Sequence, residues 1–393
     1  MSDTPPQRLA SLDTYRGIVM LLMLAEVLRL PAVAKAIPNS EFWAFLAFHQ
    51  SHVEWVGCSL HDMIQPSFSF LVGVSLPFSI AARLGRGQSQ LRMTAHAFWR
   101  GFVLIALGIF LRSIGKNQTN YTFEDTLSQI GLGYGFLFLL GLRTVRVQVI
   151  ALVTILVGYW LAFALWPLPG ADFDWSITGV KPDWPNHVTG FAAHWNKNTN
   201  LAWAFDTWWM NLFPREKPFL FNGGGYSTLS FIPTLGTMIL GLLAGGVLKS
   251  ERPAIVKLRI LGVAGIALLL TGYALGQLGI CPVVKRIWTP SWVLFSGGWC
   301  LLAMGTLYAI IDVSQFRRWT FPFVVIGANS IMAYCMEWLF IGFIVAALKR
   351  HLGKETFQVL GAEYESLLLG SGVLVVLWLI LLWMYQKRVF VRI

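Results

Sequence analysis

Long apolar stretches recur along almost the whole chain, and they constrain its fold more than any other feature. A helix needs about 20 mostly apolar residues to cross a membrane. Charged residues make up only 12% of the 393 residues, about half the usual share, which disfavours a soluble fold, a disordered chain and a nucleic-acid binder. We therefore expect an all-α polytopic transmembrane helix bundle of about ten spans, embedded in a lipid bilayer. The candidate spans are 17–37, 62–84, 97–114, 127–142, 147–168, 229–248, 258–279, 291–312, 321–347 and 366–386.

The basic residues are concentrated in alternate loops, and this predicts the orientation. The side that would hold both termini carries seventeen Lys and Arg against four acids, whereas the rest of the chain carries thirteen against fifteen. Cytoplasmic loops of membrane proteins are enriched in Lys and Arg, so we expect both termini to be cytoplasmic. The first 16 residues are polar and an apolar stretch follows them, so we expect an anchor rather than a cleaved leader.

Two irregular segments fall on the opposite side of the predicted membrane. Residues 38–61 are amphipathic and aromatic, which is typical of a helix lying in the interface. Residues 169–228 form a long loop with six Trp among many Asn. Trp faces beside amide side chains suit a sugar, although Trp is also typical of the aromatic belt at a membrane surface.

The stretch 49–66 holds the highest density of ionisable side chains near membrane depth. It contains His49, His52, Glu54, His61 and Asp62. A His beside a carboxylate is a common general base, and Gly57 would allow the turn that brings His52 to Asp62. No metal is expected, because the metal-ligand spacings H-x-x-x-H and H-E-x-x-H are missing and the four Cys show no C-x-x-C. The alternative interpretation is a polar turn at the interface.

Polar residues within the predicted spans are further candidates, because they are costly in a bilayer. Glu26 lies ten residues after Arg16, about 15 Å along a helix, and could instead be a protonated buried carboxyl. Asn329 and Glu337 are eight residues apart, on one helical face. Either could contact a substrate, and Asn329 could equally form an interhelical hydrogen bond. Gln129 lies in the fourth span.

Charged residues at the predicted cytoplasmic ends suggest a second site. Asp13 and Arg16 are spaced i, i+3, which suits either a local ion pair or a binding site. Arg100 belongs to a cluster of arginines that reflects either the positive-inside bias or a site for a nucleotide phosphate.

Two motifs carry a family resemblance. Residues 8–17 read RLASLDTYRG, and residues 52–66 fit H-x-x-W-x-G-x4-D-x3-P. Together they resemble the heparan-α-glucosaminide N-acetyltransferase family of transmembrane acetyltransferases, which has bacterial relatives of the NagX type. Shorter patches at 127–134, 288–291 and 327–330 are also similar, so the resemblance covers nearly the whole chain.

The resemblance implies an enzyme that moves acetyl from cytosolic acetyl-CoA to the amine of glucosamine or a related amino sugar. It implies that His52 is catalytic, as general base or transient acetyl carrier, and that Asp62 and Asn329 line the same cavity. Where the family often has Asn, this chain has Val27, preceded by Glu26. Where the family has Gln-Arg, it has Ser128-Gln129.

The candidates fall into three groups. The catalytic candidates are His52, Asp62 and Glu26. The substrate-binding candidates are Asn329, Glu337, Trp55 and Gln129, and the candidates for binding coenzyme A are Arg16, Asp13 and Arg100.

Other interpretations remain open. Ten spans and a midplane carboxylate also suit an amino-sugar permease without chemistry, and the same fold could support an O-acyltransferase that acts on a cell-envelope glycan. The family's large lumenal N-terminal domain has no counterpart here, which favours a small sugar as acceptor. We expect the inner membrane of a bacterium as the location. Gly241-x-x-x-Gly245 suggests a face for a homodimer.

Overall fold

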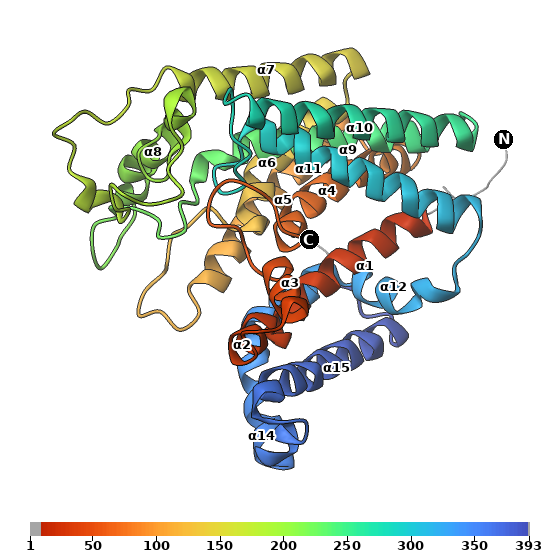
Figure 1. Cartoon of the computed structure of the whole chain (residues 1–393). Helices are drawn as coiled ribbons and strands as arrows, with labels where there is room; N and C mark the ends of the chain where they lie inside the picture. Colours follow the sequence, from red (N-terminus) through yellow and green to blue (C-terminus); the bar gives the residue numbers. More distant parts are fainter. Residues whose placement is uncertain (1–8, 392–393) are drawn as a thin grey trace.

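The computed structural model describes residues 9–391 and shows a helical bundle, with no β-strand among those residues (Figure 1). The predicted all-α membrane fold is therefore confirmed. Arg8 of the first motif lies outside the described residues, as does Arg392, which the charge count included.

The helices correspond closely to the predicted spans. The first span is α1 (Ala10–Leu24) continued by α2 (Leu30–Ala36), and the polar segments hold α3 (Glu41–His49) and α8 (Leu201–Trp209). The remaining helices are α4 (Ile64–Leu84), α5 (Gln90–Arg112), α6 (Thr126–Gly141), α7 (Val145–Ala164), α9 (Phe231–Lys249), α10 (Ala254–Gln277), α11 (Pro290–Leu307), α12 (Phe321–Gly327), α13 (Ser330–Leu339), α14 (Ile341–Leu352) and α15 (Glu365–Gln386).

The predicted count of ten spans is not confirmed. By length and apolar composition, eight of the described helices can cross a membrane, or nine if the bent pair α12–α13 counts as one span. That pair bends by 63° at Ala328–Asn329, and α6 has only 16 residues. The predicted cytoplasmic position of the termini stays a prediction.

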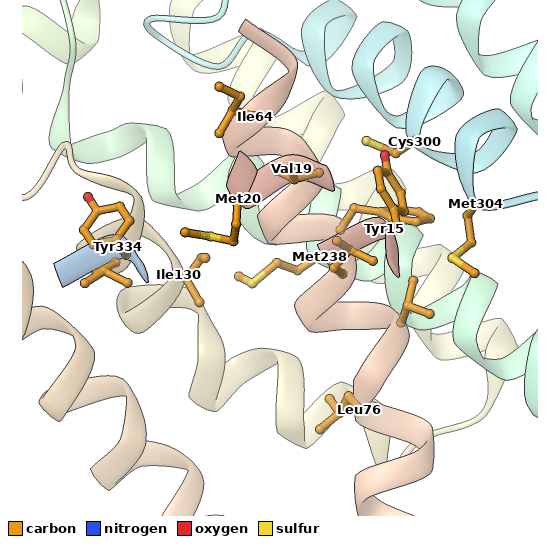
Figure 2. Packing of buried hydrophobic residues seen from close by; sticks show 14 of the residues in the cluster. Tyr15, Val19, Met20, Ile64, Leu76, Ile130, Met238, Cys300, Met304 and Tyr334 are labelled. Atoms are coloured by element: carbon orange, nitrogen blue, oxygen red, sulfur yellow. The ribbon is translucent and has the colours of Figure 1, made fainter. Parts of the chain in front are cut away.

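Close backbone approaches hold the centre of the bundle together. A Cβ atom on Gly241 would collide with the carbonyl oxygen of Phe70, and one on Gly245 with that of Val74. The small-residue face of α9 is therefore filled by α4 of the same chain and is not available for a dimer. Figure 2 shows the packed core beside this contact, where Met20, Ile130 and Met238 meet.

The helical path from α1 to α2 is interrupted beside His61. Its last turn tightens into a 3₁₀ segment (Ala25–Leu28), and Arg29 adopts a left-handed conformation with φ 51° before α2 begins. Non-glycine residues rarely adopt positive φ. The break leaves Glu26 at a bend of the chain, where its carboxylate can reach residues outside the helix.

The long loop 169–228 forms an ordered cap beyond the end of α7, and α8 lies within it (Figure 1). A second hydrophobic cluster holds the cap to the bundle, and it includes Trp55, Trp195, Phe163 and Ile287. The indole nitrogen of Trp55 donates to the carbonyl of Trp195 at 3.1 Å. The cap therefore fixes the loop that carries His52.

Candidate active site

His52 and Asp62 meet at the start of α4. The imidazole Nδ1 lies 2.8 Å from Asp62 Oδ1. Gly57, with φ 123°, supplies the turn between them. The other carboxylate oxygen accepts hydrogen bonds from the backbone N–H groups of Val53 and Ser59 and from the Ser59 hydroxyl. Asp62 is therefore held rigidly as an acceptor.

A buried lysine completes this cluster. Lys285, only 4% exposed, precedes α11, and its Nζ lies 3.2 Å from Asp62 Oδ1 and 3.1 Å from His52 Nδ1. Burial lowers the pKa of Lys285, and the carboxylate of Asp62 acts in the opposite direction. A buried lysine without an anionic partner would be very costly, so Lys285 and Asp62 stabilise each other.

We assign the tautomer of His52 from the shorter of two contacts. Nδ1 lies 2.8 Å from Asp62 Oδ1 and 3.1 Å from the Lys285 ammonium, which could also donate to it. Because a carboxylate can only accept, we place the hydrogen on Nδ1. The Lys285 ammonium then donates to Asp62, and Nε2 of His52 keeps its lone pair. Burial lowers the pKa of His52, and the charge of Lys285 lowers it further against the effect of Asp62. The ring is therefore a neutral base at physiological pH.

A cavity of about 680 Å³ lies beside this base. Its lining includes His52, His61, Glu26 and Arg29. Nε2 of His61 lies 2.8 Å from Glu26 Oε1, and the two imidazole rings are 4.5 Å apart. The structure thus brings the three catalytic candidates to one place, with Glu26 reaching His52 only through His61.

A larger cavity of about 1270 Å³ follows the opposite part of α1. Its wall on α4 runs from Phe68 to Arg83, a rise of about 22 Å. Among the described residues, basic side chains outnumber acidic ones on its lining. The only acid on this described lining is Asp13, and the bases are Arg16, Arg83, Arg100, Arg388 and His96. Arg16 contacts Asp13 and Ser75, and Arg100 donates to the Tyr134 hydroxyl. The three predicted coenzyme A candidates therefore share this cavity.

The four substrate-binding candidates lie apart from the base. Trp55 is buried in the cap cluster, and Gln129 donates to the carbonyls of Phe123, Ser227 and Thr228. Asn329 binds the backbone of Val389 and Val391 at the C-terminal segment. Glu337, on α13, forms no hydrogen bond with His52, Asp62 or Lys285 within residues 9–391, and it lies within electrostatic reach of Glu26 and Arg112.

Sequence reasoning missed three residues around His52. They are Lys285, its neighbour Arg286 and Tyr226, whose ring lies 6.4 Å from that of His52. Arg286 donates to the carbonyls of Val53 and Gly224 and stacks on Tyr226. One signal was present: Lys285 and Arg286 are adjacent bases in a loop on the side where bases are otherwise scarce.

Among residues 9–391, no group of three or more His, Cys, Asp or Glu side chains is arranged to hold a metal ion. The geometry of His52, Asp62 and Lys285 suits proton transfer and charge stabilisation.

Comparison with known proteins supports the resemblance seen in the motifs. The chain is 26% identical over 370 residues to the heparan-alpha-glucosaminide N-acetyltransferase of Homo sapiens, with 84% of this chain and 52% of that protein covered. It is 25% identical over 368 residues to the protein of that name from Mus musculus, with 83% and 53% covered. The chain spans about half the length of these relatives. No protein-family model matches it. The predicted relationship to these acetyltransferases is confirmed.

Proposed function

We propose that the chain is a membrane-embedded acetyltransferase that moves acetyl from acetyl-CoA to the amine of glucosamine or a related amino sugar. The observation that carries this proposal is a neutral His52, oriented by Asp62 and Lys285 beside a cavity, whose Nε2 has no hydrogen-bond partner within residues 9–391. The relatives, which are named N-acetyltransferases, support the same activity. By the predicted orientation, His52 lies in the outer half of the membrane of a bacterial cell.

His52 would act on the proton of the acceptor. Most glucosamine is protonated at neutral pH, so the ammonium first loses a proton to solvent. The amine nitrogen then attacks the thioester carbonyl, forming the C–N bond as the C–S bond breaks. His52 Nε2 takes the second nitrogen proton and returns it to the leaving thiolate, so the products are the amide and free coenzyme A. Asp62 stabilises the imidazolium in between.

The arginine-lined cavity would hold the donor. Arg16, Arg83 and Arg100 offer the charge-assisted hydrogen bonds that phosphate groups favour. The cavity continues along α4 to Phe68, six residues from Asp62, so a long, flexible acyl arm could extend from its basic end toward the base. Its lining is polar near Arg83 and apolar near Met20 and Leu71, which suits a ligand with an anionic head and a neutral arm.

His52 could also carry the acetyl group itself. Nucleophilic attack by Nε2 on the thioester would give an acetyl-imidazole and free coenzyme A, and the amine would then take the acetyl group. Direct transfer requires both substrates before coenzyme A is released, whereas the covalent route gives ping-pong kinetics. Release of one equivalent of coenzyme A without any acceptor would identify the covalent route.

The test uses purified protein in detergent with acetyl-CoA and glucosamine. We would follow N-acetylglucosamine by mass spectrometry, because the half-buried free thiols of Cys58 and Cys335 can react with thiol reagents. Wild-type protein should form product, and His52→Ala should not. His351→Ala is the matched control, since His351 is exposed at the end of α14. Acetyl-CoA that neither binds nor reacts would contradict the proposal and favour a permease.

A further inference from the structure

A separate polar cavity of about 230 Å³ lies under the cap, between the α5–α6 loop and the segment that follows α8. Its lining includes the side chains of Glu124, Asp206, Arg215, Phe221, Asn222 and Tyr226. None of these residues is among the catalytic or coenzyme A candidates. The volume corresponds to about eight water molecules, which suits one small ring.

Asp206 is the clearest sign that this cavity binds a ligand. The residue is 4% exposed, and its Oδ2 accepts a hydrogen bond from the backbone N–H of Thr228 at 2.9 Å. Its Oδ1 is buried and has no partner among the described residues. Buried polar atoms are nearly always paired in folded proteins. Because Asp206 lines the cavity, a small turn of its carboxylate would bring Oδ1 to an O–H or N–H donor bound there.

The other lining groups match a hydroxylated ring. Asn222 accepts from the backbone N–H groups of Gly224 and Tyr226 through its oxygen, and its amide nitrogen forms no bond within residues 9–391. Glu124 accepts from the Thr122 hydroxyl and the Phe123 N–H. Phe221 and Tyr226 offer aromatic faces. Carboxylates, an amide and aromatic rings together suit the alternating O–H and C–H surfaces of a sugar.

Tyr226 connects this cavity to the base. It lines the cavity on one side, and its ring faces His52 at 6.4 Å on the other. The turn at Gly225, with φ 79°, and the stacked guanidinium of Arg286 hold it there. A ring held in the cavity would therefore sit one aromatic side chain away from the imidazole of His52, and the Tyr226 ring must turn aside before an amine there comes within hydrogen-bond reach of Nε2.

We propose that this cavity, which we call the Asp206 cavity, binds the hydroxylated ring of the acceptor sugar and presents its amine past Tyr226 to His52. Asp206 and Asn222 are specificity-determining residues that recognise hydroxyl groups. The proposal rests on the proposed acetyl transfer and adds where the acceptor is held.

The test compares two acceptors in one assay. Asp206→Asn should raise the KM for glucosamine about tenfold, as expected when a charged hydrogen-bond partner is lost. The KM values for acetyl-CoA and for ethanolamine, an amine without a ring, should stay within about twofold. Asp183→Asn, an exposed carboxylate of the same loop, is the matched control. An equal effect on glucosamine and ethanolamine, or none on either, would overturn the proposal.

Two further measurements keep the test decisive. If Asp206→Asn does not fold, Asn222→Ala should give the same selective rise for glucosamine, and its failure to do so counts against the cavity. Equilibrium binding of radiolabelled glucosamine without acetyl-CoA separates the two proposals. If glucosamine binding requires Asp206 but the protein transfers no acetyl group, the proposed acetyl transfer is wrong and the proposed sugar site stands. If the protein transfers acetyl and Asp206→Asn leaves the KM for glucosamine unchanged, the proposed acetyl transfer stands and the proposed sugar site is wrong.

Discussion

The two ends of α1 carry opposite kinds of polar site. At one end, His52, Asp62 and Lys285 lie within 3.2 Å of one another, and Asp62 is almost fully buried. At the other, arginines surround a cavity of about 1270 Å³. A proton-transfer group needs fixed partners that set its tautomer and pKa, whereas a large anion needs space and several cations. The difference supports the proposed division, in which one end holds the base and the other binds the donor.

Replacing His52 should give the largest effect. We expect His52→Ala to lower kcat for acetyl transfer by about 10²–10⁴-fold, the range typical of general-base loss. The affinity for acetyl-CoA, measured by equilibrium binding, should stay unchanged because the coenzyme would bind at the other end. If His52→Ala weakened acetyl-CoA binding as much as it lowers kcat, the proposed separation of the base from the coenzyme site would be wrong.

Lys285→Met should lower kcat about tenfold to a hundredfold, as expected when Asp62 loses a charged hydrogen-bond partner. The charge of Lys285 lowers the pKa of His52, so its removal raises that pKa. Because His52 works as the neutral base, the acid limb of the kcat/KM–pH profile should move to higher pH. Lys285→Arg keeps the charge and should leave the limb in place. If the acid limb of the kcat/KM–pH profile stays in place in Lys285→Met, Lys285 has a structural role only.

Arg83→Ala should weaken acetyl-CoA binding about tenfold, the loss expected for one charge-assisted hydrogen bond. The pH profile of the chemical step should not change. The effect should shrink at high salt, because exposed charges are screened. Arg146→Ala is the control, since Arg146 is exposed and lies away from the cavity. Equal losses in both variants would indicate a general surface-charge effect instead.

Asn329→Ala should have the smallest effect. Its amide binds the backbone of Val389 and Val391 on either side of Phe390, which lines the arginine cavity with Arg388. Losing these bonds should raise the KM for acetyl-CoA about fivefold, in line with about 1 kcal/mol for a hydrogen bond. Asn329 could instead donate a hydrogen bond to the thioester carbonyl oxygen as it becomes negatively charged during attack by the amine. In that case Asn329→Ala would lower kcat about 10²–10³-fold.

Local patterns predicted much of the fold, because membrane helices must satisfy their backbone within one apolar segment. The exceptions have local causes. Helix α6 is too short to count as a span, and α12–α13 breaks at Ala328–Asn329, where the sequence reads as one apolar run. The sequence analysis also missed the break between α1 and α2 near Glu26, although Pro31 at the start of α2 was a signal for it.

The site was predictable only where its residues are close in sequence. His52 and Asp62 are ten residues apart around Gly57, so their contact could be expected from one turn. Lys285 is 223 residues from Asp62, and only the packing of the cap brings it there. Trp55 and Gln129 were candidates for substrate binding by residue type, yet the indole N–H of Trp55 and the amide N–H group of Gln129 donate to backbone carbonyls.

The short α6 has a consequence for the membrane itself. Its 16 residues rise about 24 Å, less than the roughly 30 Å of a hydrocarbon layer. Its outward residues Phe136 and Leu139 are exposed, whereas Thr126 and Tyr134 of the same helix line the arginine cavity. A bilayer that covers those outward residues would have to thin beside α6. The distance between the two aqueous phases would then be shorter along the wall of that cavity than beside the longer helices.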